Sequence, residues 1–195
     1  MLGLFSHQYQ HQFWKNIAFE NTNSQKITLR SGETIHIRQI SAHDGDWIRE
    51  LYTGLSPQSC NQRFNTSFEV IAPSFVEKLA QQTAFDAANQ GYGLLILVDD
   101  RSHLLGMRPV AIGRYVTSGA KEAEVAFTVA DDYQGLGLGS LLMKRLIKQA
   151  KKSMISTLSA YVQPNNVAMQ SLIIKSNQAA SLEHVGSMLH YQLYL

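Results

Sequence analysis

Three glycines at alternate positions, Gly135, Gly137 and Gly139, form the segment of this sequence with the clearest chemical meaning. Without Cβ atoms at these positions, consecutive backbone N–H groups can turn toward one anion. A helical pattern begins directly after the turn, and the unpaired N–H groups and positive dipole end of a helix N-terminus favour a phosphate. The turn Gln134–Gly139 therefore predicts a pyrophosphate site, to which Ser140 can add a hydroxyl donor.

Two familiar phosphate-binding loops share this order of strand, turn and helix, but they fit the residues less well. A Walker A loop places a lysine between its last glycine and a Ser or Thr, whereas Gly139 is followed directly by Ser140. A Rossmann turn has glycines at its first, third and sixth positions, and here they occupy the first, third and fifth, late in the chain. The turn alone thus indicates a phosphate held at the start of a helix.

The elements that hold the turn are predicted from hydrophobic periodicity. Residues 125–129 alternate as a strand before it, and apolar residues recur at helical spacing through 138–150 after it. Earlier strands are predicted at 92–98 and 110–116. Toward the C-terminus, the pattern predicts a strand at 158–162, a helix at 167–174 and a strand at 188–195. This order is that of a mixed α/β domain.

The N-terminal third carries its own start signals for strands and helices. Residues 27–37 alternate around a Ser-Gly turn and predict a β-hairpin. Ser41 and Asp44 form a capping-box pattern at the start of a predicted helix. Pro57 and Pro73 stand where prolines begin helices, so two further helices are expected.

Composition limits the class of protein. The 195 residues are 45% hydrophobic and 16% charged, which predicts one globular domain over 26–195 behind an N-terminal arm, 1–25. A net charge of +2 with scattered basic residues argues against a nucleic-acid partner. The single cysteine, Cys60, excludes an intrachain disulfide and favours a reducing cytoplasm. Polar residues from His7 onward argue against a signal peptide or membrane span. His7 and His11 lack a third ligand, so no metal site is expected.

The turn and its surroundings resemble the GNAT superfamily of N-acetyltransferases. In that superfamily the acetyl-CoA turn reads Gln or Arg, any two residues, Gly, any residue, then Gly or Ala, which Gln134, Gly137 and Gly139 match. The preceding strand, 124–129, and the downstream Pro164-Asn165-Asn166 stand in the places that these enzymes use. From residue 27 onward the chain looks most like bacterial protein lysine acetyltransferases. The segments that carry this closer likeness are 28–34, 37–40, 55–57 and Arg63-Phe64.

The resemblance implies a fold and a cofactor site. It implies a mostly antiparallel central sheet, splayed at the acetyl-CoA strand and flanked by helices. Backbone groups of Phe127, Thr128 and Val129 would pair with the pantetheine arm, and Asn166 would approach the cofactor. Acetyl-CoA would be the co-substrate, with its pyrophosphate held by Gln134, Gly135, Leu136, Gly137, Leu138, Gly139 and Ser140.

Glu124 falls where the related enzymes place a general base. An attacking lysine must be neutral, and a carboxylate near the thioester can take its proton directly or through water. The alternative is that Glu124 is a surface residue that alternates outward from Val125 and Phe127 on a half-exposed strand. Glu122 lies on the same strand face and is the main rival for the role of base. Cys60 has no histidine partner in a recognisable motif, so a covalent enzyme intermediate is not expected.

Two departures from the superfamily pattern concern the acceptor side. Many members carry a tyrosine as general acid on the late helix, but seven residues after Asn166 this chain has Ile173. Asn177-Gln178 replaces the Gly-Phe that usually ends that helix, and asparagine can occupy a left-handed cap. We therefore expect an N-acetyltransferase whose acceptor is a protein lysine. A small amine or polyamine acceptor, or a non-catalytic acetyl-CoA sensor, are the alternatives.

Overall fold

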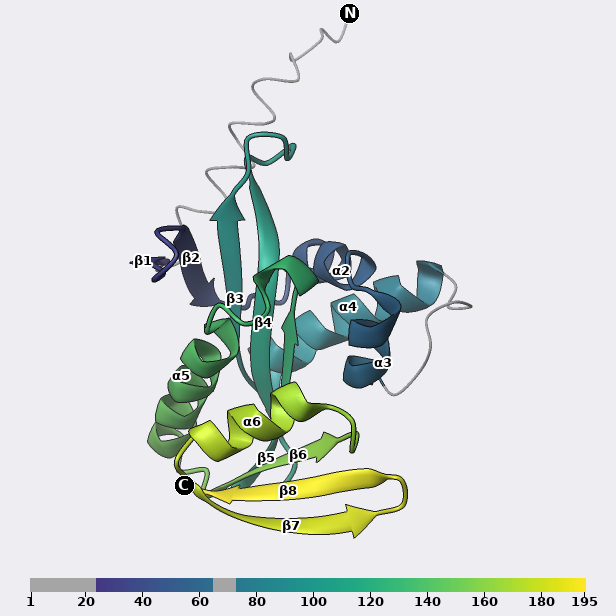
Figure 1. Ribbon diagram of the computed structural model, residues 1–195, viewed down its shortest axis with the longest axis vertical. Helices are drawn as coiled ribbons and strands as arrows, with labels where there is room; N and C mark the ends of the chain where they lie inside the picture. The colour runs from purple at the N-terminus through teal and green to yellow at the C-terminus, as the bar shows by residue number, and fades with distance from the viewer. Residues whose placement is uncertain (1–23, 65–72) are drawn as a thin grey trace, which may run out of the picture.

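Alternating apolar residues build the first half of the sheet. The computed structural model describes residues 24–64 and 73–195, and Figure 1 shows its strands in the order β1-β2-β3-β4-β5-β6-β8-β7. The first five strands run antiparallel to one another. Leu94–Val98 of β3 is buried because helices cover both faces of the sheet there. The strands are β1 (Gln25–Thr28), β2 (Thr34–Gln39), β3 (Gly91–Asp99), β4 (Met107–Thr117) and β5 (Glu122–Val129).

The last three strands form the other half. They are β6 (Thr157–Val162), β7 (Ala179–Val185) and β8 (Met188–Tyr194), and β8 lies between the other two. The sequence predicted β6 and β8, but β7 was not predicted. β7 is an edge strand in which nearly every side chain is exposed, so it lacks the apolar alternation of a half-buried strand.

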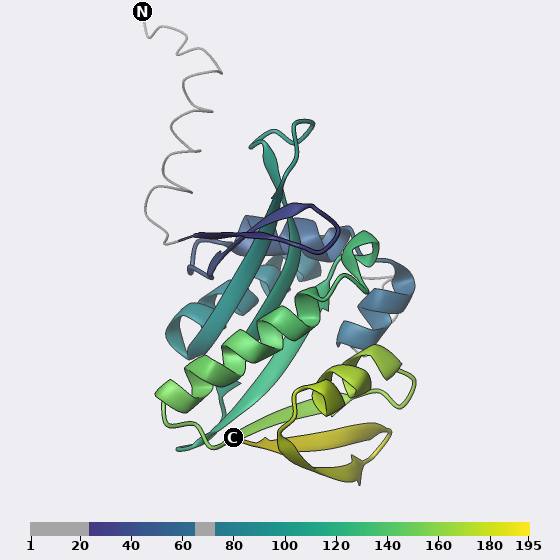
Figure 2. The ribbon, with the colours of Figure 1, turned by 60° about the vertical axis from the view of Figure 1, so that its left-hand side comes forward.

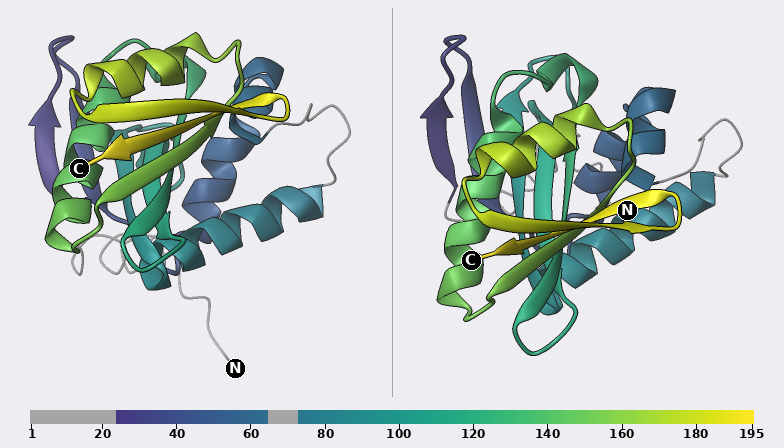
Figure 3. Two further views of the ribbon diagram at one scale, coloured as in Figure 1. Left: turned by 90° about the horizontal axis from the view of Figure 1, so that it is seen from below. Right: turned by 60° about the horizontal axis from the view of Figure 1, so that its bottom comes forward.

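The two halves meet at a short parallel ladder and then diverge. β5 pairs with β6 only through Glu122, Ala123 and Glu124, opposite residues 157–159 of β6. Beyond Glu124, β5 keeps its pairing with β4 while β6 keeps its pairing with β8. Figure 3 shows β6, β8 and β7 leaning away from the strands of the first half. The prediction of a mostly antiparallel sheet that is splayed at the acetyl-CoA strand is therefore confirmed.

Helices cover both faces of this sheet (Figure 2). α5 and α6 lie on one face, which we call the α5 face, and α2, α3 and α4 lie on the other, which we call the α3 face. Pro57 and Pro73 begin α3 and α4 as predicted. No helix in the described ranges is long and apolar enough to span a membrane. The helices are α2 (Gly45–Thr53), α3 (Pro57–Phe64), α4 (Pro73–Asn89), α5 (Leu138–Lys152) and α6 (Val167–Lys175).

The start of α2 differs from the capping box that Ser41 and Asp44 predict. The helix begins at Gly45, and the Asp44 carboxylate makes no cap hydrogen bond. It instead forms two hydrogen bonds with the Arg38 guanidinium, at 2.6 and 2.7 Å, and accepts one from the Ser41 N–H at 2.6 Å. The carboxylate thus makes the backbone half of the predicted box, to the Ser41 N–H, but the Ser41 hydroxyl accepts from the His43 N–H and the helix begins only at Gly45.

Two predictions remain, one for the N-terminal arm and one for the residue that follows α6. The predicted arm, residues 1–25, with His7 and His11, lies outside the described residues apart from residues 24 and 25, and Gln25 already belongs to β1. After α6, Asn177 adopts a left-handed conformation with φ of 58°, as expected for an asparagine in place of glycine.

Candidate functional site

The glycine turn joins β5 to α5 through two left-handed residues. Gly135 has φ of 76° and Gly137 has φ of 89°, conformations that side chains disfavour. Gly137 is the N-cap of α5, and its carbonyl accepts the N–H of Leu141. Gly139 lies in the first turn of α5, where an added Cβ would make an ordinary contact, at 3.5 Å, with the side chain of Leu172 on α6. The left-handed backbone therefore accounts for two of the three glycines, Gly135 and Gly137.

A cleft of about 540 Å³ opens where β5 and β6 diverge. Its walls are β5, the glycine turn, β6, α3 and the first turns of α6. Leu136, which was predicted to hold pyrophosphate, does not border the cleft and is exposed. The other predicted site residues all border it: Glu124, Phe127, Thr128, Val129, Gln134, Gly135, Gly137, Leu138, Gly139, Ser140 and Asn166.

The cleft has walls on both faces of the sheet. Phe127 points to the α5 face, since its ring lies 3.0 Å from where a Cβ of Gly113 would be, beside Leu142 of α5. Thr128 points to the opposite face, where its hydroxyl accepts a hydrogen bond from Arg63 Nε of α3 at 3.1 Å. Side chains on both faces of β5 therefore border the cleft.

Glu124 and Glu122 are separated by the geometry. Both side chains are exposed and lie on the α3 face of β5. Glu124 borders the cleft and is the last residue of β5 that pairs with β6, opposite Ser159. Glu122 lies two residues back along the closed part of the ladder and does not border the cleft. Only the Glu124 carboxylate can reach a molecule held at the point of divergence.

Asn166 has a structural task in addition to its place on the cleft wall. Its Oδ1 accepts the backbone N–H of Met169 at 3.0 Å, so it caps α6. The position that lacks a tyrosine, Ile173, is 3% exposed and belongs to the core. No acidic group can reach the cleft from that position of α6.

Polar side chains anchor α3 across the cleft, a feature that the sequence did not predict. The Asp131 carboxylate accepts hydrogen bonds from the backbone N–H and hydroxyl of Ser56 and from the hydroxyl of Ser59. Gln134 donates to the Ser59 hydroxyl and to the Val129 carbonyl. These contacts fix the N-terminal end of α3 to the segment between β5 and the glycine turn.

The other end of α3 is tied to the second half of the sheet. The side-chain amide of Gln163, just after β6, donates to the carbonyl and the side-chain oxygen of Asn61, both at 2.9 Å. Together with the bond from Arg63 to Thr128, α3 contacts both diverging strands. This helix is therefore tied to both sides of the cleft.

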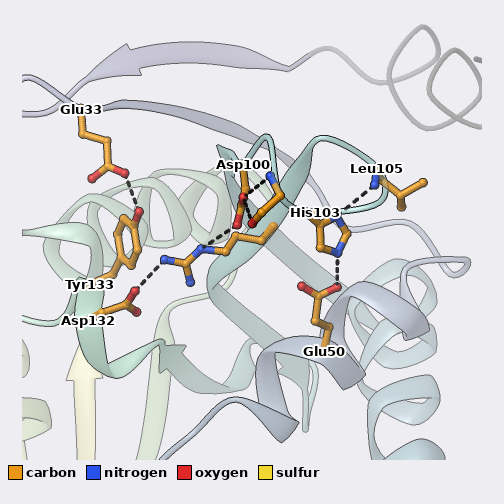
Figure 4. Close-up of polar contacts among 9 residues, drawn as sticks. Glu33, Glu50, Asp100, His103, Leu105, Asp132 and Tyr133 are labelled. Atoms are coloured by element: carbon orange, nitrogen blue, oxygen red, sulfur yellow. Dashed lines mark hydrogen bonds and ion pairs between the residues drawn. The ribbon is translucent and has the colours of Figure 1, made fainter. Parts of the chain in front are cut away.

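A second network supports the residue that precedes the glycine turn (Figure 4). The Tyr133 hydroxyl donates to the Glu33 carboxylate, and the Arg108 guanidinium lies over the Tyr133 ring, 4.9 Å from its centre. Arg108 also forms ion pairs with Asp132 and Asp100. Burial raises the pKa of Tyr133 to about 12, and the hydrogen bond and charge of Glu33 add to this shift. The phenol stays protonated and fixes the start of the turn.

The sequence patterns predicted no role for three residues that line or flank the cleft. Arg63 borders it from α3, and Tyr161 borders it from β6, where its ring stacks on His190 at 4.4 Å. Arg114 stands behind them on β4, beside the α3 face of β5. The charge and aromaticity of these residues were visible in the sequence, but their meeting depends on strand register. In the described part of the chain, no group of three potential metal-ligating side chains is arranged around one point.

The fold and the cleft agree with a family match. The sequence model of the Acetyltransferase (GNAT) family matches residues 58–175, and the chain belongs to this family of N-acetyltransferase enzymes. The family uses acetyl-CoA as its acetyl donor. The matched region contains α3, the splayed strand, the glycine turn and α6.

Particular relatives extend the match. Acetyltransferase PA5475 of Pseudomonas aeruginosa is 30% identical over 146 residues, which cover 74% of this chain and 75% of that protein. Acetyltransferase Pat of Mycolicibacterium smegmatis is 40% identical over 79 residues, which cover 40% of this chain and only 24% of that longer protein.

Solved structures share the fold at lower identity. The GNAT domain of S. lividans PAT superposes with a TM-score of 0.70 at 23% identity, covering 88% of this chain and 97% of that domain. The PaiA N-acetyltransferase from Thermoplasma acidophilum, solved with coenzyme A, has a TM-score of 0.59 at 16% identity and covers 83% of this chain and 99% of that one. Both confirm the GNAT fold.

Proposed function

We propose that this enzyme acetylates lysine side chains of proteins by direct transfer from acetyl-CoA, with Glu124 as the general base. The observation that carries the proposal is the position of Glu124. It stands where β5 leaves β6, beside the strand edge that becomes free for a ligand, and it faces the α3 side of the sheet. A base at that point can take a proton from an amine that enters the cleft from the α3 face.

The residues of the cleft fit acetyl-CoA. Bound there, the cofactor would supply the acetyl thioester. The edge of β5 after Glu124 offers backbone groups that pair with no other strand on that side, as an extended pantetheine arm requires. The turn 134–140 offers the N–H groups of an open helix N-terminus, and Gly135 and Gly137 leave it free of side chains. Asn166 and Leu172 border the same space from α6.

Direct transfer is supported by the surroundings of the single cysteine. A covalent route would need an exposed thiolate near the thioester. Cys60 is 3% exposed, does not border the cleft, and has a pKa that is raised by burial and by the charge of Asp131. Its thiol is therefore protonated and out of reach, which leaves attack by the acceptor amine itself.

The choice of a protein lysine rests on resemblance. The Mycolicibacterium relative is named Pat, and the S. lividans structure is the GNAT domain of a PAT protein. The wall of the cleft on the α3 face carries Arg63, Gln62 and Tyr161, and a cleft of this size is open enough for an extended side chain. A long lysine side chain can reach Glu124 from the protein surface without its backbone entering the cleft.

One observation favours a second candidate, a non-catalytic acetyl-CoA sensor. Ile173 is buried where many GNAT enzymes carry a tyrosine acid, so the departing thiolate receives no proton from α6. The two candidates differ in turnover but share cofactor binding.

The decisive test is mass spectrometry of acetylated lysines after the purified protein is incubated with a cytoplasmic extract and acetyl-CoA. New acetyl-lysine sites that disappear with Glu124→Gln support the proposal. Acetyl-CoA binding by calorimetry, with no thioester loss toward any protein or amine, would establish the sensor. Acetylation of polyamines or other small amines without protein sites would replace lysine as the acceptor.

A further inference from the structure

Two arginines stand near Glu124 on the α3 face without a carboxylate partner. Arg63 borders the cleft, its Nε donates to the Thr128 hydroxyl at 3.1 Å, and its guanidinium lies 5.0 Å from the centre of the Phe64 ring. In the part of the chain that the structure describes, no Asp or Glu forms an ion pair with Arg63 or with Arg114. The terminal nitrogens of Arg63 are therefore available to a ligand.

Arg114 places a second cation behind the first. It lies on β4, diagonal to Glu124 across the ladder with β5, and shares the α3 face with it. Its Nε is buried and has no hydrogen-bond partner. Burial lowers the pKa of Arg114 and the charge of Arg63 lowers it further, against the opposing effects of Tyr52, Asp86 and Glu124. The protein thus holds two like charges together where solvent is partly excluded.

Asp86 and Glu124 offset part of this repulsion without forming an ion pair with either guanidinium, so a further anion in the cleft would be stabilised beside Arg63. A guanidinium presents a planar fork of donors that matches a carboxylate, and its hydrogen bonds to an anion are among the stronger ones in proteins. Under the proposed function, the phosphates of acetyl-CoA are held by the glycine turn at the start of α5 rather than by these arginines. An anion that occupies the free terminal nitrogens of Arg63 would then arrive with the acceptor.

We propose that Arg63 binds a carboxylate of the acceptor beside the amine that is acetylated, with the charge of Arg114 behind it, so that the enzyme selects lysines flanked by Asp or Glu. This inference rests on protein lysine acetylation as the proposed function. The same two positive charges lower the pKa of a lysine ammonium that enters beside Glu124. The arrangement therefore selects the substrate and also favours the neutral amine that Glu124 must generate.

Matched peptides test the inference. A lysine flanked by Asp is compared with the same lysine flanked by Asn, which has nearly the same shape and no charge, and kcat/KM is measured for each. We expect the Asp peptide to be preferred by about tenfold or more, as for a hydrogen bond to a charged group. In Arg63→Gln the preference should fall toward one while the calorimetric Kd for acetyl-CoA is unchanged. Lys78→Gln, which removes one exposed positive charge on α4, should keep the preference.

The outcomes separate this inference from the function on which it rests. Equal rates for the Asp and Asn peptides in the unmodified enzyme would overturn the acidic preference and leave lysine acetylation intact. No acetylation of any peptide or protein would overturn both. Loss of acetyl-CoA affinity in Arg63→Gln would assign this arginine to the cofactor and sink the inference. Arg114→Gln, checked for folding by circular dichroism, should repeat the effect, and Arg63→Gln decides alone if it does not fold.

Discussion

At the scale of single residues, the chemistry of this enzyme depends on where a strand stops pairing. Glu124 and Glu122 have the same side chain, lie on the same face of β5 and are both exposed. They differ in that Glu124 ends the ladder with β6 and borders the cleft, whereas Glu122 lies within the closed ladder. Two neighbouring carboxylates therefore have unequal access to the cleft.

This difference gives the first prediction. Glu124→Gln keeps the shape of the side chain but removes the base, so kcat should fall by about a hundredfold to ten-thousandfold. The dependence of kcat on pH should also change. Glu122→Gln is the matched control and should keep both kcat and pH profile. The measurement is a steady-state assay of thioester loss over a range of pH. Unchanged turnover in Glu124→Gln would remove the carboxylate from the mechanism.

The glycine turn gives the second prediction. Gly137 and Gly32 have nearly the same φ, 89° and 88°, and a Cβ added at either position would meet no atom within 4 Å. Aspartate at either position should cost a similar folding free energy, about 1 kcal/mol, because the left-handed conformation is disfavoured. Gly137→Asp should also abolish acetyl-CoA binding in calorimetry, since a carboxylate would stand beside the pyrophosphate. Retained binding in Gly137→Asp would refute the role of the turn.

How much of the site could be predicted from the sequence depends on how far apart its residues lie along the chain. The glycine turn and Glu124 lie within 16 residues of one another, so local pattern and resemblance place them together. Arg63 meets Thr128 across 65 residues, and the pairing of Gln163 with Asn61 spans 102. Such contacts depend on helix placement and strand register, which no local pattern specifies. The part of the site that faces the acceptor was therefore the part that sequence missed.

At the scale of elements, α3 acts as a wall of the cleft because its polar contacts hold it there. Asp131 accepts three hydrogen bonds from Ser56 and Ser59 at the start of the helix. Burial raises the pKa of Asp131, but these hydrogen bonds outweigh it, so the pKa lies below its usual value. The anchor is therefore intact at neutral pH and is lost only as acid protonates the carboxylate.

The third prediction tests that anchor. Asp131→Ala removes three hydrogen bonds, so the amides of residues 57–64 should exchange hydrogen faster at neutral pH. Hydrogen exchange with mass spectrometry measures this directly. Asp132→Ala is the control: its carboxylate pairs with Arg108 rather than with α3, and exchange of 57–64 should stay as in the unmodified protein. Unchanged exchange in Asp131→Ala would mean that packing alone positions the helix.

The ion pair between β2 and α2 gives the fourth prediction. The side chains of Arg38 and Asp44 are 3% and 7% exposed. Asp44→Ala leaves a buried guanidinium without its partner, so the free energy of unfolding should fall by about 3–5 kcal/mol. Asp46→Ala breaks an ion pair whose carboxylate is 80% exposed and should cost less than about 1 kcal/mol. Urea unfolding followed by circular dichroism compares the two, and equal losses would contradict a buried pair.

The elements that bury an apolar face were predicted from the sequence, whereas the exposed edge strand β7 was not. The apolar repeat of α5 and the buried run of β3 predicted both elements to within two residues. β7 is paired on one side only and leaves its side chains in solvent, so its sequence carries no burial signal. The capping box at Ser41 did not set the start of α2: the Asp44 carboxylate accepts the Ser41 N–H as the pattern predicts and also binds Arg38, but the helix begins only at Gly45.

At the scale of the whole molecule, the two halves of the sheet share only three residue pairs between β5 and β6. A cofactor that contacts β5, the glycine turn and α6 would add a second connection between the halves. Acetyl-CoA at a hundred times its Kd should then stabilise the folded state by about 2.7 kcal/mol.

The fifth prediction is the resulting rise in the thermal midpoint, about 5–10 °C for a chain of this size. Differential scanning fluorimetry with increasing acetyl-CoA measures it. Gly137→Asp should show no rise at the same concentrations, and desulfo-coenzyme A should reproduce most of the effect because the phosphates are retained. A thermal midpoint that does not change with acetyl-CoA in the unmodified protein would contradict binding where β5 and β6 diverge.

The order of the strands also bears on how the chain is made. β1 to β5 occupy consecutive positions in the sheet, and β6, β8 and β7 are likewise drawn from one continuous stretch. A ribosome therefore releases the complete first half, with α5 to cover it, before the second half has been translated. Each part can dock against neighbours that already exist, which limits the time that unpaired strand edges are exposed to other nascent chains. The line along which β5 and β6 diverge is therefore also the boundary between the half of the sheet that is synthesised first and the half that is synthesised last.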